Sequence, residues 1–504
     1  MCTVDPRLPL VAASLLAAAC AAPAASSPSP ARSLPCASAP AAAPAAVGRF
    51  DPAPYLDDLA ALRDAMASHY ANLEWAVNDR RMDLPALLRK TDGRIREAKS
   101  DAEAMRAIDG FLDAFGDGHL FVEWPTKGAA EKAPAGTLCA RLGYTREAKA
   151  GVDFALTGAF APLDDADAVD FPGGVLRLSD GVKVGTIRIG LFMAEAHPAL
   201  CEAARRELGL GDDAACDDAC EDRIVTSVHD RMTAALERRA VALGRAGATA
   251  IVVDLTRNGG GSDWVEPAAR VLTKVPLRAP RLAFVRHEHW AKRLREKLGD
   301  VQADRAKKDD PVLASAEATL RAAIDEAGAP CDRRALFDAG AGKPPCSGLV
   351  TGRMYTSGLL PYAKPGSLDA WASADSLFLT RQFRYHEGAS SLPLIVLVDG
   401  GTASASEEFA SMLADNHAAL IVGSITTGSG CGFTNGGIPT VLPRSNGHVK
   451  MSDCARLRAD GSNEASGVVP DVLLPLASRD SPYQRATKVA AGLTIASKSK
   501  WRLR

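Results

Sequence analysis

The sequence has almost no net charge, because 59 Lys and Arg residues are balanced by 61 Asp and Glu residues, which leaves a formal charge of −2. It has no basic stripe interleaved with aromatic residues, which argues against nucleic acid or a charged membrane surface as a partner. The HExxH signature of zinc peptidases and the G-x-S-x-G elbow of α/β-hydrolases are also missing. We expect no metal site and no cofactor, and a peptide, a protein or a small molecule as the partner.

The most informative segment is 394–410, which reads LIVLVDGGTASASEEFA. A short apolar strand here runs into small residues that open an amphipathic helix. A serine at such a corner is exposed beside amides at the positive end of the helix dipole, which suits an oxyanion forming next to its hydroxyl. Ser404 is therefore the candidate nucleophile. The alternative is an ordinary helix N-cap, a common role of Ser and Thr at helix starts.

Three sequence blocks resemble the serine-peptidase family of C-terminal-processing (tail-specific) proteases and follow the family's order. They are IVVDLTRNGGG at 251–261, the block around Ser404, and the turn GVVPD at 467–471. The resemblance places the family's catalytic serine on Ser404. It also implies a crotonase-like α/β core and an oxyanion-hole amide from the glycine turn of the first block.

The turn after the serine helix departs from this family. Members of the Ser/Lys type carry Gly-Lys-Gly, whereas residues 428–430 read Gly-Ser-Gly, and no lysine occurs in 424–442. A serine hydroxyl needs a base within hydrogen-bond reach. The block FGDGHLFVEW at 115–124 is similar to the DGHT block of nisin-resistance-like members, which use its histidine as the base; Leu120 replaces the Thr.

His119, the histidine of this block, is therefore predicted to be the general base. An unperturbed imidazole titrates near pH 6.5, so it can accept the proton of Ser404 at neutral pH. The alternative is a histidine that only makes structural hydrogen bonds near a glycine turn.

An oxyanion hole needs two backbone donors that converge on one oxygen about 3 Å away. The amide of Ala405, next to the nucleophile, is expected to supply one donor. The paired glycines Gly260 and Gly261 are expected to supply the other, because a missing side chain lets a substrate carbonyl approach the backbone closely.

Further polar residues are candidates for supporting roles. Glu407 lies in the first turn of the serine helix, where interaction with the helix dipole is its main expected role and orientation of the histidine or the substrate is the alternative. Asp415, later on that helix, is expected to be architectural. Glu464 could orient the base, by analogy with tricorn-type relatives, and Ser429 occupies the place of the family's lysine.

Residues 1–20 predict an export signal, with Arg7 before an apolar run that is too short to span a bilayer. Either lipidation at Cys20 or ordinary signal cleavage is expected. Residues 21–48 are an Ala/Pro/Ser-rich linker, a composition that cannot bury a core. The expected location is the periplasm or the outer cell surface, with membrane contact only through a lipid anchor.

Cysteine usage agrees with export, because eight of the eleven cysteines lie from Cys139 onward and could form four bridges in an oxidising compartment. Proximity in the sequence favours two pairs, Cys331 with Cys346 and Cys431 with Cys454. Cys201, Cys216 and Cys220 compete for the remaining bridges, and Cys139 could join one of them.

The chain is expected to be an α/β protein with a helical N-terminal domain at 49–125 and a small β-rich segment at 126–181, which is short for a PDZ domain. Alternating strands and helices predict a mostly parallel sheet in a catalytic core at 182–478. An insertion at about 280–345 should be helical, and 479–504 is expected to be a C-terminal tail.

The predicted function is that of an exported serine endopeptidase. Ser404 would be acylated with His119 as general base, an amine would leave, and water activated by the same histidine would hydrolyse the ester. The competing hypothesis is a non-catalytic peptide-binding or ligand-binding protein on the same fold, which the missing lysine favours. The joint presence of Ser404, His119 and the glycine turn argues against it.

Overall fold

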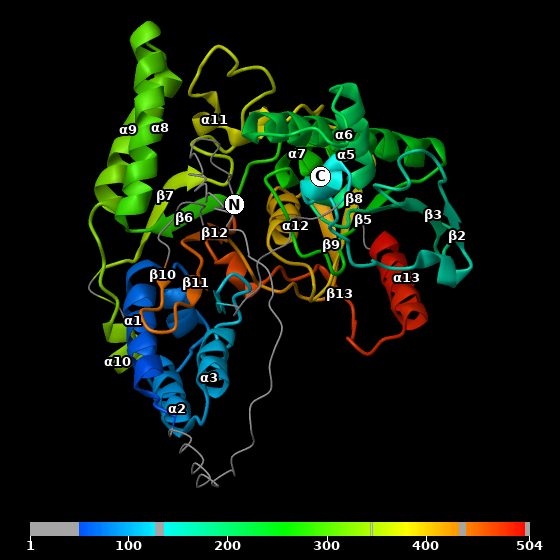
Figure 1. Cartoon of the computed structure of the whole chain (residues 1–504). Helices are drawn as coiled ribbons and strands as arrows, with labels where there is room; N and C mark the ends of the chain where they lie inside the picture. The colour runs from blue at the N-terminus through cyan, green and yellow to red at the C-terminus, as the bar shows by residue number, and fades with distance from the viewer. Residues whose placement is uncertain (1–49, 126–135, 343, 345, 433–439, 499–504) are drawn as a thin grey trace, which may run out of the picture.

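The computed structural model describes residues 50–125, 136–342, 344, 346–432 and 440–498 (Figure 1). The expected export signal, the linker and Cys20 lie outside the described residues. None of the described helices is both long enough and apolar enough to cross a lipid bilayer.

The core is a seven-stranded sheet with the order β13-β9-β8-β5-β4-β3-β2. Pairing from β4 to β13 is parallel, and β2 and β3 continue the sheet in antiparallel fashion. The sheet confirms the predicted α/β class with a mostly parallel sheet. Its strands are β2 (Phe160–Pro162), β3 (Gly173–Arg177), β4 (Lys183–Arg188), β5 (Ile251–Asp254), β8 (Leu394–Val398), β9 (Ala419–Gly423) and β13 (Val472–Leu473).

Both faces of this sheet are covered, which explains why β5 and β8 are continuous apolar runs and fully buried. Successive side chains alternate between the faces. Ile251 and Val253 join the larger apolar cluster, and Val252 joins the cluster on the opposite face. The larger cluster draws on α5 (Pro198–Glu207), α6 (Asp218–Arg245), α7 (Val265–Leu272) and α12 (Ala405–Asp415).

The opposite face is covered mainly by α13 (Pro482–Lys498), with the 3-10 turn η2 (Phe154–Thr157) beside it. Val489 and Leu493 of α13 pack in the same cluster as Ile395 and Leu397 of β8. The expectation of a C-terminal tail at 479–504 is therefore wrong over the described residues. These residues form a helix because their apolar side chains close the second face of the sheet. Figure 1 shows this helix in red beside the main sheet.

The segment 126–181 does not form a small β-rich unit of its own where it is described, from residue 136 onward. It begins with the short helix α4 (Leu138–Arg141). Its strands β2 and β3 then extend the main sheet, because β3 pairs with β4 across a tight turn at 178–182.

A helical unit fills the lower left of Figure 1. It contains α1 (Ala53–His69), the π-helical turn η1 (Trp75–Asp79), α2 (Leu84–Glu97) and α3 (Asp101–Asp113), and α10 (Ala335–Ala339) packs on α2. A small antiparallel sheet adjoins it, with β1 (Phe121–Glu123), β11 (His448–Lys450) and β10 (Thr440–Val441) in that order. This unit therefore combines N-terminal residues with segments from much later in the chain.

A second small antiparallel sheet has the order β12-β6-β7. The helices α8 and α9 pack against each other and project beside β6 and β7 at the upper left of Figure 1. The elements of this region are β6 (Arg281–Val285), α8 (Glu288–Lys307), α9 (Pro311–Ala327), β7 (Leu349–Tyr355), α11 (Ala374–Leu377), η4 (Leu379–Gln382) and β12 (Cys454–Leu457). Two further 3-10 turns are η3 (Ala194–Ala196) and η5 (Glu464–Ser466).

Candidate active site

Ser404 lies at the corner between β8 and α12 with φ 56° and ψ −120°, a conformation that non-glycine residues rarely adopt. Such backbone strain costs on the order of 1–3 kcal/mol and persists only where the surroundings hold it. Asp399 is one such support, because one of its oxygens accepts from the amides of Arg257 and Gly401 at 2.8 and 2.9 Å. Its other oxygen binds Arg485 of α13 at 2.6 Å. The corner is thus tied to the turn after β5 and to the C-terminal helix.

Glu407 gathers four donors on its buried carboxylate. Oε2 accepts from the amides of Ser404 and Ser429, both at 2.9 Å. Oε1 accepts from the Thr426 hydroxyl and the Gly428 amide, both at 2.6 Å. Burial, with a smaller contribution from a neighbouring acid, raises the pKa of this carboxyl above its ordinary value. Glu407 therefore joins the serine corner to the loop at 426–429, which is more than an interaction with the helix dipole.

Arg456 of β12 is buried behind Ser404 and binds its carbonyl through Nη2 at 2.7 Å. The same guanidinium contacts Glu464 Oε1 through Nε and Nη2, at 2.9 and 2.6 Å, and Glu408 Oε2 through Nη1 at 3.2 Å. The second oxygen of Glu464 accepts from the Ser411 hydroxyl at 2.9 Å. Glu464, expected to orient the base, thus reaches Ser404 through Arg456.

His119 lies in the turn between α3 and β1, with its ring held by Ser429. Nδ1 lies 3.0 Å from the Ser429 carbonyl oxygen. Because a carbonyl oxygen only accepts, Nδ1 carries the proton and Nε2 is the basic nitrogen of the neutral ring. Nε2 lies beside Gly432, where a Cβ atom would come within 3.5 Å of it. Burial lowers the pKa of His119 below its ordinary value, and the charge of Asp117 and the Ser429 carbonyl oppose part of this shift.

Asp117 fixes the turn that carries His119. Its Oδ1 accepts from the His119 amide at 2.9 Å. Its Oδ2 accepts from the Tyr70 hydroxyl at 3.1 Å, and from the Asn72 amide group and the Ser452 hydroxyl, both at 2.9 Å. The turn is therefore bound to the end of α1 and to the residues just before β12.

The glycine turn after β5 lies directly against the serine corner. A Cβ atom on Gly260 would come within 2.7 Å of Ser404 Cβ and 2.9 Å of the Ala405 nitrogen, so only glycine fits there. The Gly260 amide donates to Asn258 Oδ1 at 2.8 Å. Gly260 thus leaves room beside Ser404. Its predicted role as an oxyanion donor conflicts with this hydrogen bond, because its amide already donates to Asn258. The amides of Ala405 and Gly261 are the better candidates.

Ser429 links the two halves of the site. Its amide donates to the same Glu407 oxygen as the Ser404 amide, and its carbonyl accepts from His119. The residue in the place of the family's lysine thus holds the histidine predicted to replace that lysine. Sequence reasoning missed Arg456 and Asp117. The available signals were a lone arginine in the apolar strand CARL and the aspartate of the DGH block.

Four disulfides are present among the described residues, and two of them match the expected pairs, Cys331–Cys346 and Cys431–Cys454. The other two are Cys139–Cys201 and Cys216–Cys220. Cys431 lies two residues after Ser429 and Cys454 two residues before Arg456, so their bridge joins the segments that hold His119 and Ser404. Within the described ranges, no group of three His, Cys, Asp or Glu side chains is arranged to hold a metal ion.

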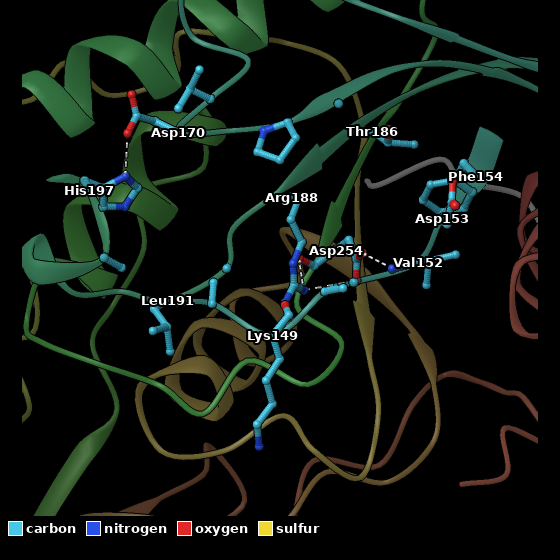
Figure 2. A pocket seen from close by; sticks show the side chains of 18 of the residues that line it. Lys149, Val152, Asp153, Phe154, Asp170, Thr186, Arg188, Leu191, His197 and Asp254 are labelled. Atoms are coloured by element: carbon cyan, nitrogen blue, oxygen red, sulfur yellow. Dashed lines mark hydrogen bonds and ion pairs between the residues drawn. The ribbon is translucent and has the colours of Figure 1, made fainter. Parts of the chain in front are cut away.

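A pocket of about 480 Å³ lies at the carboxyl ends of β4 and β5. Figure 2 shows Arg188 and Asp254 pointing toward each other, with Arg188 Nη1 3.0 Å from the Asp254 carbonyl and 3.4 Å from Oδ1. The amide of Val152 donates to Asp254 Oδ2 at 2.8 Å. Apolar lining comes from Val152, Phe154, Phe160, Val169, Pro172 and Leu191. Carboxyl edges of parallel sheets commonly bind ligands.

The mostly parallel sheet, the strained serine at the end of β8 and a histidine linked to it through Ser429 and Glu407 are features of a serine hydrolase with an α/β fold. Residues 224–474 match the family model described as Peptidase family S41. These residues therefore form a Peptidase family S41 domain, that of a serine peptidase.

One relative is the carboxy-terminal-processing protease of Bartonella bacilliformis (strain ATCC 35685 / KC583 / Herrer 020/F12,63), which is 32% identical over 95 residues. The match covers 18% of this chain and 20% of that relative, so it spans only a fifth of the relative's length. Two similar solved structures are those of mature CPAF complexed with lactacystin and of mature CPAF, both at 15% identity. Their TM-scores are 0.51 and 0.50; the matches cover 88% and 87% of this chain and 98% and 96% of those chains. They show that the fold is shared.

Proposed function

We propose that the protein is an exported serine endopeptidase that cleaves peptide bonds through an acyl-enzyme on Ser404. The hydroxyl of Ser404 attacks the substrate carbonyl while His119 takes its proton, and His119 then protonates the leaving amine. Water, deprotonated by the same histidine, hydrolyses the ester and restores both side chains. The contact between His119 Nδ1 and the Ser429 carbonyl carries the proposal, because it presents Nε2 as the base.

The lowered pKa of His119 fits this role. A base must be unprotonated before the reaction, and burial favours the neutral imidazole. The protonated ring therefore forms only at a pH below the ordinary histidine value, so the activity should persist to a lower pH than an unperturbed histidine would allow.

The amides of Ala405 and Gly261 are the proposed oxyanion donors. Ala405 begins α12, where the first amides have no partner inside the helix and the dipole favours negative charge. The glycine turn lies close enough to the corner for a carbonyl to reach both amides, as the tight approach of Gly260 to Ser404 indicates. Two such donors stabilise the charge that develops during attack.

The proposed substrates are peptides or proteins, in keeping with the family. The pocket at the ends of β4 and β5 would accept apolar substrate side chains, because much of its lining is apolar and its half-buried Arg188 pairs with the buried Asp254. Export, expected from residues 1–20, is supported by the four disulfides, since such bonds persist in oxidising compartments.

Labelling with a rhodamine fluorophosphonate, which reacts with activated serines, tests the proposal. The wild type should be labelled, whereas Ser404→Ala should not be, and His119→Ala should be labelled at least about a thousandfold more slowly. The rate for the wild type should fall to half its maximum below pH 6.5, the ordinary histidine value. A folded wild type that is not labelled would instead favour a non-catalytic peptide-binding protein.

A further inference from the structure

Both peptide units that flank Ser404 are held by buried charged side chains on the side of the protein interior. Glu407 accepts from the Ser404 amide at 2.9 Å, and Arg456 donates to the Ser404 carbonyl at 2.7 Å. That carbonyl also accepts the helix amides of Glu407 and Glu408, at 3.0 and 3.1 Å. The bond from Arg456 is shorter and carries a full charge, and charge-assisted bonds are about twice as strong as neutral ones.

The carbonyl bound by Arg456 shares its peptide plane with the Ala405 amide. In a trans peptide the C=O and N–H bonds are coplanar and point in opposite directions. A guanidinium that holds the Ser404 oxygen inward therefore aims the Ala405 N–H outward, to the side where Gly260 leaves room beside the Ser404 side chain. If this peptide rotated, the N–H would be lost from the site, although Ser404 and His119 would both remain.

The position of Arg456 is itself strongly determined. Its side chain is almost completely buried, and it bridges Glu464 and Glu408 while it contacts Ser404. Burial alone would lower the pKa of Arg456, but the charges of Glu464 and Glu408 raise it by more than burial lowers it. The pKa of Arg456 therefore lies above the ordinary value, and its charge is permanent. The strained φ of Ser404 favours rotation of this peptide toward a relaxed conformation, and the bond to the fixed charge of Arg456 opposes that rotation.

We propose that Arg456 is a positioning residue that locks the Ser404–Ala405 peptide and thereby aims one of the two oxyanion donors. The proposal rests on the function proposed above, because the amide matters only if Ser404 is acylated. Arg456 does not touch the reacting atoms; it acts through the backbone of the nucleophile.

The test compares Arg456→Lys with Arg458→Lys. Lysine keeps the charge beside Glu464 but lacks the planar fork that reaches three partners at once. Arg458 is a matched control, because it lies two residues further along, forms a forked pair with Asp415 at 2.6 to 3.0 Å, and is not among the groups that hold Ser404. Each purified variant is labelled with the rhodamine fluorophosphonate over a range of concentrations, which separates the maximal rate of labelling from the concentration giving half that rate. Melting temperatures are measured in parallel.

We expect Arg456→Lys to lower the maximal labelling rate at least tenfold, part of the hundredfold or larger loss that removal of an oxyanion donor causes. Its half-saturating concentration should change less than about threefold, because binding the probe does not require the hole. Arg458→Lys should keep its labelling rate within about twofold even where its melting temperature falls, since it removes an ion pair without changing the donors.

If Arg456→Lys does not fold, the double variant Arg456→Gln with Glu464→Gln, which keeps the net charge, replaces it. Its maximal labelling rate is then compared with that of the wild type. If the wild type is labelled and an Arg456 variant keeps the same maximal rate, the positioning role is overturned and the peptidase proposal stays intact. A wild type that is not labelled would instead overturn the peptidase proposal.

Discussion

Ser404 and His119 reach the site from regions that are built in different ways. Ser404 follows a fully buried strand of the main sheet, and buried charges bind both of its flanking peptide units. His119 comes from a turn of the helical unit, and its ring is bound by the Ser429 carbonyl of a loop from the other side. The nucleophile is thus fixed by the core, whereas the position of the base depends on how two units meet. Changes near Ser404 should affect stability and chemistry together, and changes near His119 mainly chemistry.

The largest effect on this comparison is expected from Glu407→Gln, because Glu407 binds both the Ser404 corner and the loop that holds His119. In Glu407→Gln an NH2 group would face amide donors that now meet a carboxylate oxygen. We expect a loss of about 3 kcal/mol in the free energy of unfolding from buried unsatisfied donors. The rate of fluorophosphonate labelling should fall at least about a hundredfold, as when an oxyanion donor is lost.

The control for Glu407→Gln is Asp415→Asn at the far end of the same helix. Asp415 also accepts several bonds, from Arg458 and from the Ala459 amide, but it lies away from Ser404. The Asp415→Asn variant should be less stable than the wild type and should keep the wild-type labelling rate. Equal labelling of the two variants would contradict the role given to Glu407.

The bridge Cys431–Cys454 sharpens the comparison, because it joins the loop that holds His119 to the strand that holds Ser404. Replacing both cysteines by serine should cost about 3 kcal/mol, since the bond closes a loop of 23 residues. Labelling should slow as well, because the loop that carries the Ser429 carbonyl would keep its bonds to Glu407 but lose its covalent link to β12.

Its control is the bridge Cys216–Cys220, which closes only four residues and lies away from the site. Replacing that pair should cost about 2 kcal/mol and leave labelling unchanged. Chemical denaturation and labelling rates measure both effects. A slowing of the same size in the two variants would mean that the Cys431–Cys454 bridge contributes only general stability.

The smallest effect is expected for Ser429→Ala. The backbone carbonyl and amide of Ser429 make its contacts with His119 and Glu407, and alanine keeps both. The labelling rate and its pH profile should stay within about twofold of the wild type, because no hydrogen bond to the base is removed. A large loss in this variant would show that the hydroxyl, rather than the backbone, supports the base.

The sequence predicted the parts of the site that are locally encoded. The strand-to-helix corner at Ser404, the glycine turn after β5 and the DGH turn are each contained in about ten residues, where apolar runs and small residues have direct structural meaning. The two expected disulfides belong to the same class, because their cysteines are close in the sequence. Tertiary support for these parts could not be predicted in the same way.

Arg456 shows why. It meets Ser404, 52 residues earlier, only because β12 pairs with β6 and passes behind α12. Similarly, the apolar positions of α13 did not reveal that a second face of the sheet needed covering, and the short strands β2 and β3 gave no sign that they would join the main sheet. These outcomes depend on which surfaces meet in the complete fold rather than on any local pattern.

The bond from Arg485 of α13 to Asp399 shows that the serine corner depends on a helix outside the segment matched by the family model. The segment matched by the family model, 224–474, contains Ser404 but omits His119, three strands of the main sheet and the helix that closes its second face. A gene fragment encoding only that segment would express an open sheet edge with one bare apolar face, and the aspartate that braces the serine corner would lose its arginine. A fragment intended to fold and keep this site should therefore extend from α1 to α13.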